Sequence, residues 1–267
     1  MKTVRELMRL DGRVALITGG AGHIGTAMAE ALAELGCHLC LVDVDKQRLD
    51  EVKAGIVATC PVRVQSVVCE LEDEAARTRL PAIVRSEFGR LDVLVNNAAF
   101  VGSRQLEGWV APFENQSLAT WRRAFEVNLT TAFHLSQAFA PVLREGGCGS
   151  IVNVGSIYAL VGPDMSLYAG TAMGSPAAYA ASKGGLLQLT RWLSTVLAPE
   201  VRVNSISPGG VARGQPESFV TRYVARTPLR RMATEEDFKG AIAYLASDLS
   251  AYVTGENIVV DGGWSAW

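Results

Sequence analysis

The sequence has no large excess of charge of either sign and no long run of apolar residues. Its 25 Lys and Arg residues are balanced by 27 Asp and Glu residues, for a formal net charge of −2, so no basic surface for nucleic acid is expected. Nowhere do the roughly 18 uncharged apolar residues of a transmembrane helix follow one another. The N-terminal segment MKTVRELMRL interleaves charged and apolar side chains, unlike a signal peptide. We therefore expect a cytoplasmic protein that binds a small molecule, with no nucleic-acid or membrane partner.

Cysteine is also scarce, with 5 residues in 267. An odd number cannot pair completely within one chain, and several cysteines lie in apolar runs where a reduced thiol behaves as a small hydrophobic group. Cys37 and Cys40 have C-x-x-C spacing, but no second Cys or His pair with zinc-ligand spacing accompanies them. We therefore expect free thiols and no metal site.

No low-complexity linker and no internal repeat divides the chain, and 267 residues can form one large hydrophobic core. Apolar runs rich in β-branched residues alternate with segments of helical periodicity almost from end to end. This alternation is typical of a parallel sheet with helices on both faces. We therefore expect an α/β fold in one domain, residues 1–267, with roughly seven strands in a doubly wound parallel sheet.

The elements follow from the local pattern of the chain. Strands are predicted at Val14–Thr18, Leu39–Asp43, Val62–Val68, Val93–Asn96, Ser150–Gly155, Val201–Ser207 and Ile258–Val260. Helices are predicted at Ile24–Leu35, Lys46–Ala58, Asp73–Phe88, Leu118–Ala140, Ala177–Leu197 and Glu235–Leu245. Phe100–Ser117 and Tyr158–Pro176 break the alternation directly after predicted strands, and are interpreted as walls of a substrate pocket, with surface insertions as the alternative.

A glycine-rich turn follows the first predicted strand. Gly20, Gly22 and Gly25 fit the pattern G-x-G-x-x-G at the start of a predicted helix. Glycine lets the backbone approach a diphosphate closely, and the free amide groups at the N-terminus of a helix attract its negative charge. The turn therefore predicts a dinucleotide site, although the glycines alone could form a tight turn without a ligand.

Asp43 ends the second predicted strand, about 20 residues beyond the turn. A carboxylate there can accept a hydrogen bond from the 2′-hydroxyl of a ribose and repels a 2′-phosphate. Neither the turn nor Val44 supplies a Lys or Arg that would hold such a phosphate, although Lys46 lies close in sequence. The pattern predicts NAD as the cofactor in preference to NADP.

The helix predicted at Ala177–Leu197 places Tyr179 and Lys183, four residues apart, on one face. A free phenol has a pKa of about 10, and a nearby ammonium favours the phenolate and lowers that value, with help from a positive nicotinamide. Tyr179 can then take a proton from an alcohol, or donate one to a ketone. Tyr168 is the rival acid, but Ala172 rather than a cation lies four residues on.

Two further polar residues support this assignment. Ser156, just beyond the fifth predicted strand, offers a hydroxyl that can orient the substrate oxygen. Asn128 offers an amide that can connect Lys183 to a chain of water molecules. Asn128, Ser156, Tyr179 and Lys183 are therefore the candidate catalytic residues.

The order of these motifs resembles the short-chain dehydrogenase/reductase family from about Arg13 to Gly263. The resemblance rests on Thr18-Gly19…Gly25, Asn96-Asn97-Ala98-Ala99, Asn128, Ser156, Tyr179…Lys183, Pro208-Gly209 and Gly255…Val260-Asp261-Gly262-Gly263. It implies a Rossmann-type fold with seven parallel strands, a Ser–Tyr–Lys–Asn active site and a homodimer or homotetramer. It also implies that Glu70-Leu71 lies near adenine and that the backbone at Pro208–Val211 lies near the nicotinamide. The cofactor-binding residues expected on all these grounds are Gly19, Gly22, His23, Ile24, Gly25, Asp43, Val44, Glu70, Leu71, Asn97, Ala98, Ala99, Tyr179, Lys183, Pro208, Gly209 and Val211.

Some positions depart from the family pattern. His23 stands where the dehydrogenase/reductase branch usually has its middle glycine, so that Gly19-x-x-Gly22-x-x-Gly25 looks more like the sugar-nucleotide epimerase branch. Those enzymes usually carry a larger C-terminal domain, for which this chain has no room. Glu70 replaces a usual Asp, and the Thr expected after Pro208-Gly209 is missing near Ala212-Arg213. The Ser156–Tyr179 segment is longer than in most relatives.

That long segment is similar to reductases of bacterial surface-sugar and flagellin-glycan pathways. The expected function is therefore NAD-dependent hydride transfer to or from a secondary alcohol or ketone, with a sugar phosphate or nucleotide sugar as a candidate substrate. Its phosphate could meet Arg104, Arg213 or Arg222, although an arginine of this kind is more often a solvated surface charge. Trp264 and Trp267 could cover the pocket, contact another subunit or anchor the chain. The alternatives are a 3-oxoacyl-thioester or other small-ketone reductase, an epimerase and an inactive NAD-binding regulator.

Overall fold

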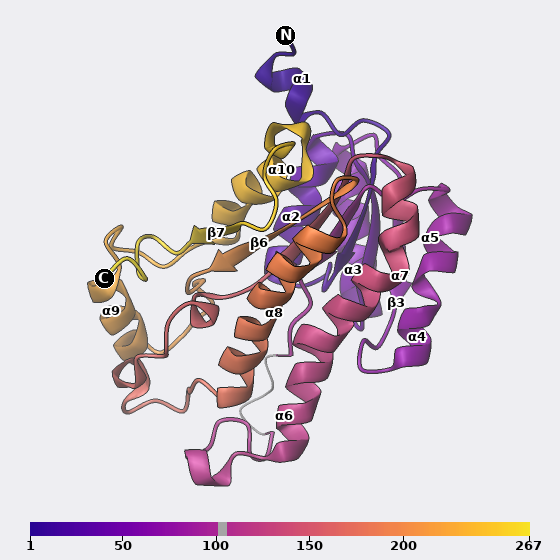
Figure 1. Ribbon diagram of the computed structural model, residues 1–267. Helices are drawn as coiled ribbons and strands as arrows, with labels where there is room; N and C mark the ends of the chain where they lie inside the picture. Colours follow the sequence, from indigo (N-terminus) through magenta and orange to yellow (C-terminus); the bar gives the residue numbers. More distant parts are fainter. Residues whose placement is uncertain (101–105) are drawn as a thin grey trace.

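One seven-stranded sheet runs through the computed structural model, which describes residues 1–100 and 106–267 (Figure 1). The strand order is β3-β2-β1-β4-β5-β6-β7, and every neighbouring pair is parallel. The strands are β1 Val14–Thr18, β2 His38–Asp43, β3 Val64–Val68, β4 Val93–Asn96, β5 Gly149–Val154, β6 Val201–Pro208 and β7 Asn257–Val260. The predicted α/β class is confirmed, and every predicted strand is present with ends shifted by at most two residues.

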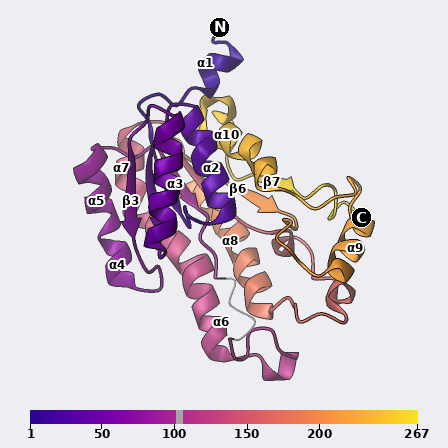
Figure 2. The same ribbon diagram turned by 180° about the vertical axis from the view of Figure 1, so that it is seen from behind.

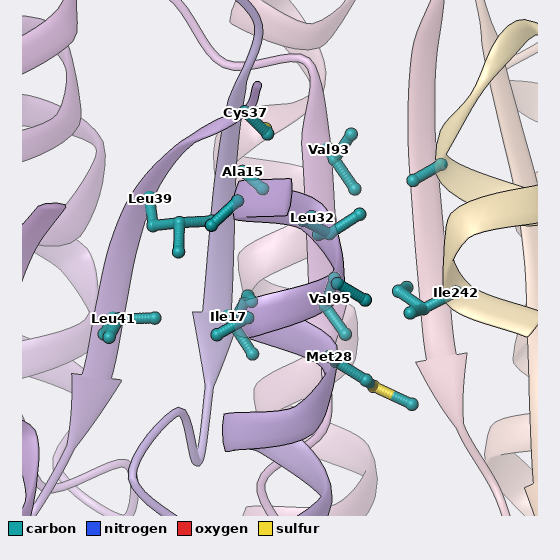
Figure 3. Close-up of a cluster of buried hydrophobic side chains, with 14 of the residues drawn as sticks. Ala15, Ile17, Met28, Leu32, Cys37, Leu39, Leu41, Val93, Val95 and Ile242 are labelled. Atoms are coloured by element: carbon teal, nitrogen blue, oxygen red, sulfur yellow. The ribbon is translucent and has the colours of Figure 1, made fainter. Parts of the chain in front are cut away.

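Helices cover both faces of the sheet because the central strands are apolar on both faces. Alternate residues of β1 point to opposite sides, so that Ala15 and Ile17 enter one core and Val14 and Leu16 the other. The first core holds α2 (His23–Glu34), α3 (Lys46–Thr59) and α10 (Lys239–Ala246), and Figure 3 shows Met28, Leu32 and Ile242 of α2 and α10 beside the strands. The second core holds α5 (Leu80–Phe88), α7 (Thr131–Glu145) and α8 (Ala177–Val196). Figure 1 has α7 and α8 in front of the sheet, and Figure 2 has α2 and α3.

Several predicted helices are divided in the structure. The helix predicted at Asp73–Phe88 is two helices, α4 (Glu74–Thr78) and α5, because Pro81 lacks an amide hydrogen and therefore begins a new helix. The helix predicted at Leu118–Ala140 consists of α6 (Leu118–Phe125), a π-helical turn (Glu126–Thr130) and α7, which continues to Glu145. The helix predicted from Glu235 begins with the 3₁₀ turn Glu235–Phe238 before α10.

Two helices were not predicted from the sequence: α1 (Val4–Met8) and α9 (Glu217–Arg226). Figures 1 and 2 both show α9 apart from the sheet, beside the C-terminus. It packs against the segment predicted as a pocket wall, in which Ile157–Ala159 and Met165–Tyr168 form 3₁₀ turns. Phe219, Tyr223 and Trp264 lie in this small third core, so the segment is a packed part of the fold.

Candidate active site

A cavity of about 790 Å³ lies where the strands β1, β2, β4, β5 and β6 end. Parallel strands place all their carboxyl ends at one edge of the sheet, which is where open α/β sheets bind ligands. Ser156 lines this cavity together with every residue expected to bind the cofactor: Gly19, Gly22, His23, Ile24, Gly25, Asp43, Val44, Glu70, Leu71, Asn97, Ala98, Ala99, Tyr179, Lys183, Pro208, Gly209 and Val211. The sequence-derived residues are thus brought together, with Asn128 as the exception.

The glycine turn is shaped by close backbone packing. Gly19 has a φ of +63°, and a Cβ atom there would lie 2.9 Å from the Cα atom of Ala98. A Cβ atom on Gly25 would lie 2.1 Å from the carbonyl oxygen of Gly19. Gly22 is the N-cap of α2 and offers no side-chain acceptor to the first amide groups of that helix. Gly20 does not line the cavity, so the turn uses Gly19-x-x-Gly22-x-x-Gly25.

Asn97 and Thr18 join the end of β4 to this turn. The Asn97 side-chain amide donates to the carbonyl oxygens of Thr18, at 2.9 Å, and Gly19, at 3.0 Å. The Thr18 hydroxyl oxygen accepts hydrogen bonds from the backbone amides of Asn97 and Ala98, both at 3.1 Å. Thr18 was seen in the sequence as part of the motif without a role, and the structure shows that it fixes the cavity floor.

The carboxylate of Asp43 is held across the glycine turn. Its Oδ2 atom accepts a hydrogen bond from the amide of Ala21 at 3.1 Å. Its Oδ1 atom accepts from the amides of Val44, at 2.8 Å, and Asp45, at 3.3 Å. A negative charge is therefore fixed at the wall of the cavity formed by β2.

Tyr179 and Lys183 come from the first turns of α8, where Pro176 precedes the helix. The side chains of Tyr179 and Ser156 both line the cavity, and the Ser156 hydroxyl is close enough to lower the pKa of Tyr179. Lys183 is 1% exposed, and its ammonium donates to the carbonyl oxygen of Val154 at 2.7 Å. The Nζ atom of Lys183 lies 5.9 Å from the centre of the Tyr179 ring. The acid/base candidate, its cation and the orienting hydroxyl are therefore adjacent.

The electrostatics of this group differ from the sequence-based expectation. Burial raises the pKa of Tyr179 above its usual value, which outweighs the lowering by the hydrogen bond from Ser156 and by the charge of Arg213. Burial also lowers the pKa of Lys183 to about 8. Acidification of Tyr179 was expected from Lys183 together with a positive nicotinamide; without the cofactor, desolvation dominates for both groups.

Asn128 lies beside the cavity and outside its lining. It belongs to the π-helical turn and is buried. Its side-chain amide donates to the hydroxyl of Ser182 at 2.9 Å, and its Oδ1 atom accepts from the amide of Phe100 at 2.6 Å. Asn128 therefore fixes α8 next to Lys183 and makes no direct hydrogen bond to the ammonium.

Tyr168 is not available as an acid at the cavity. Its hydroxyl lies 2.6 Å from that of Tyr158, and burial raises the pKa of both groups. Neither residue lines the cavity. The structure therefore favours Tyr179 over its rival.

The three arginines considered for phosphate binding have different positions. Arg213 lines the cavity. Arg222 instead donates to the carbonyl oxygens of Leu167 and Ala169 and so braces the segment before α8. Arg104 lies outside the described residues. Trp264 is fully buried and stacks on Tyr223 at 5.8 Å between ring centres, so it anchors the chain internally.

Several residues that the sequence did not single out also line the cavity. Met173 comes from the long segment before α8, and Gln215 from the loop after β6, where it donates to the carbonyl oxygen of Val211 at 2.7 Å. The remaining ones are Cys69, Glu72, Phe100, Val127, Val154 and Gly155. Except for Val127, which lies in a predicted helix, their signal in the sequence is only that they follow, or end, predicted strands.

The described residues contain neither a cluster of metal ligands nor a helix able to span a membrane. Over residues 1–100 and 106–267, no three His, Cys, Asp or Glu side chains come together in a way suited to a metal ion. None of the helices in the same ranges combines the length and apolar character needed to cross a membrane.

Known proteins match this chain over almost its whole length, including the residues that line the cavity. The sequence model of a family described as enoyl-(acyl carrier protein) reductase matches residues 19–265. The cis-4-hydroxycyclohexanecarboxylate dehydrogenase of Sinomonas cyclohexanicum is 34% identical over 259 residues, which cover 95% of this chain and 97% of that protein. The galactitol 2-dehydrogenase (L-tagatose-forming) of Cereibacter sphaeroides is 33% identical over 274 residues, with 98% and 99% covered.

Solved structures of similar sequence have the same fold. The NADPH-dependent 3-quinuclidinone reductase of Rhodotorula rubra is 28% identical and has a TM-score of 0.89, with 100% of this chain and 96% of that chain covered. The matched residues include the glycine turn, Ser156, Tyr179 and Lys183. The chain therefore belongs to the short-chain dehydrogenase/reductase family, and it is an oxidoreductase that acts on alcohols or ketones with a nicotinamide cofactor.

Proposed function

We propose that the protein is an NAD-dependent dehydrogenase/reductase of secondary alcohols and ketones, with Tyr179 as the acid/base. The observation that carries the proposal is that Ser156, Tyr179 and Lys183 open into the same cavity as the glycine turn and Asp43. One domain, residues 1–267, then supplies both the cofactor site and the reacting groups.

The residues present fit a dinucleotide. Gly19 and Gly25 leave no space for a side chain, so backbone forms the wall at the start of α2. Free amides at this point suit a diphosphate. Asp43 is fixed at the end of β2, where its oxygens can accept hydrogen bonds from ribose hydroxyls and its charge disfavours a 2′-phosphate. This supports NAD over NADP.

In the proposed mechanism the protein moves a proton. When bound, the nicotinamide accepts or supplies the hydride. The hydroxyl of Ser156 holds the substrate oxygen by a hydrogen bond. The phenolate oxygen of Tyr179 receives the proton from the alcohol, and in the reverse direction the Tyr179 hydroxyl donates its proton to the ketone oxygen. Burial holds Tyr179 in the protonated form in the ligand-free protein, so it acts as a base only when further positive charge lies beside it.

The experiment that tests this proposal is the substitution Tyr179→Phe, which removes only the hydroxyl. We expect turnover to fall by at least ~100-fold, because proton transfer by a positioned side chain contributes about that much or more. NAD binding, measured by calorimetry, should remain close to wild type. Tyr168→Phe is the matched control, since it removes a hydroxyl outside the cavity, and it should retain activity. Wild-type rates in Tyr179→Phe would contradict the assignment.

For the substrate we propose a polyol or sugar derivative, with a sugar phosphate or nucleotide sugar included. The relative named galactitol 2-dehydrogenase supports this class. A 3-oxoacyl thioester is the second candidate, favoured by the description of the matching family. Turnover with a panel of polyols, sugar phosphates and acetoacetyl thioesters, followed by NADH absorbance, separates the two. An epimerase would consume no cofactor, and a regulator would show no turnover with any alcohol.

A further inference from the structure

Two departures from the family pattern meet at one carboxylate. His23 replaces a glycine in the turn, and Arg213 lies where a Thr is expected. The Oε1 atom of Glu235 lies 3.3 Å from Nδ1 of His23 and 3.6 Å from Nε of Arg213. Glu235 belongs to the 3₁₀ turn before α10, so three separate segments converge here. The two unusual residues are therefore neighbours in space.

His23 shows in which part of the cavity this pair of residues, His23 and Arg213, lies. It is the first residue of α2 and follows Gly22, and both residues line the cavity. Because Glu235 joins the two side chains, the guanidinium of Arg213 lies near the start of α2. That is the part of the cavity where the free amides of a helix N-terminus face an anion.

Arg213 is the cation best placed to bind a ligand there. Among the described lining residues the Lys and Arg side chains are Lys183 and Arg213. Lys183 is buried and donates to Val154. The Nη atoms of Arg213 donate to no described residue, and its pair with Glu235 is long and partly exposed. Such a pair adds little stability, so the guanidinium can exchange Glu235 for an anionic ligand at small cost.

We propose that Arg213 binds the diphosphate of the dinucleotide opposite the N-terminus of α2, and that Glu235 holds the guanidinium there in the empty site. The inference rests on the proposed NAD-dependent function. A diphosphate presents charged oxygens to which a guanidinium can donate two parallel hydrogen bonds, and such bonds are stronger than those between neutral groups. Arg213 thereby supplies a charged donor at a position where a neutral hydroxyl is expected.

The test measures binding of dinucleotide fragments, so it does not depend on turnover. ADP-ribose contains the diphosphate, and adenosine lacks it. Both ligands are titrated calorimetrically into wild type, Arg213→Gln and Arg213→Lys. Arg213→Lys keeps the positive charge but loses the paired N–H donors of the guanidinium, whereas Arg213→Gln also loses the charge. Arg231→Gln is the matched control, because Arg231 is also a loop arginine paired with an acid, Asp237, and does not line this cavity.

We expect Arg213→Gln to bind ADP-ribose about tenfold more weakly, which corresponds to ~1.4 kcal/mol, with adenosine affinity unchanged. Arg213→Lys should fall between Gln and wild type, and Arg231→Gln should match wild type. The salt dependence of ADP-ribose binding should also weaken in Arg213→Gln.

Three results would overturn the inference. If Arg213→Gln binds ADP-ribose as well as wild type while NADH still forms, the inference fails and the proposed function stands. If both ligands weaken equally, the substitution has disturbed the cavity and the diphosphate contact is refuted. If wild type binds neither NAD nor ADP-ribose, the proposed function itself fails, and the inference with it.

Discussion

At the scale of single residues, burial dominates the properties of the reacting groups. Lys183 is enclosed by α8 and β5 and offers its ammonium to one carbonyl oxygen, that of Val154. Burying a charge with one partner is costly, and the pKa of Lys183 falls to about 8 as a result. The buried charge therefore lowers stability at this position, a cost that the proposed role of Lys183 in proton transfer would explain.

This cost has a measurable pH dependence. The pKa of Lys183 is lowered to about 8 from an ordinary value of 10.5, so between these pH values the unfolded chain binds more protons than the folded one. The free energy of unfolding should therefore rise with pH across this window, by about 3 kcal/mol from this residue. Urea denaturation from pH 7.5 to 10 should show the rise in wild type and lack it in Lys183→Met. Parallel pH profiles in the two proteins would contradict the buried, depressed ammonium.

The proposed preference for NAD rests on one side chain, Asp43. Asp43→Asn keeps an oxygen that can accept from the amide of Ala21 and removes the negative charge. We expect the preference of kcat/KM for NAD over NADP to fall by about tenfold or more, because the repulsion of a 2′-phosphate disappears. Asp45→Asn is the control, since Asp45 caps α3 and does not line the cavity. An unchanged preference in Asp43→Asn would show that another residue selects the cofactor.

At the scale of elements, the regular parts of the fold were predictable and the irregular ones were not. Strands such as β1 and β4 were found because a parallel sheet covered on both faces requires continuous apolar runs. The π-helical turn at Asn128 was missed, because its apolar spacing hardly differs from that of an α-helix. α9 was missed because it packs on other loops rather than on the sheet.

The same distinction holds for the site. Tyr179, Lys183 and the glycine turn were predictable because their spacing alone places them on one helix face or in one turn. Met173 and Gln215 were not, because they lie in loops whose conformation depends on distant contacts. Gln215, for example, is fixed by hydrogen bonds to the backbone of Val211 and Arg213.

The missed helix α9 supports the cavity through Tyr223. Its hydroxyl accepts a hydrogen bond from the amide of Gly210 at 2.5 Å, and Gly209 and Gly210 have no room for a Cβ atom against the residues around them. Tyr223→Phe leaves this amide without an acceptor, which should lower the free energy of unfolding by about 1–2 kcal/mol. The loop at Pro208–Val211 should loosen, raising KM for NAD several-fold more than it changes kcat.

Tyr252→Phe is the control for this prediction, because Tyr252 is fully exposed. It should leave both quantities unchanged. Equal stability of Tyr223→Phe and wild type would mean that the Gly210 amide finds another acceptor.

At the scale of the whole molecule, large apolar side chains remain exposed on neighbouring helices. Trp121 of α6, Phe133 of α7, and Trp192 and Val196 of α8 are each more than a third exposed. Exposed apolar side chains of this size favour association. We therefore expect a homodimer or homotetramer, as the family resemblance implies.

Light scattering coupled to gel filtration measures the mass directly against a chain of 28.5 kDa. Trp192→Glu and Phe133→Glu should shift the distribution toward the monomer, whereas Tyr252→Glu should not. A monomer in the wild-type protein over micromolar concentrations would contradict the expectation.

The stack of Trp264 on Tyr223 has a consequence for how the enzyme matures. Residues from the glycine turn to Val211 contain nearly every group that touches the cavity, yet the loop at Gly209 and Gly210 rests on an aromatic pair completed near the end of the chain. A nascent polypeptide can therefore form the amino-terminal strands early and still lack a rigid cavity wall at this loop. We expect catalytic competence to arise only after Trp264 has left the ribosome.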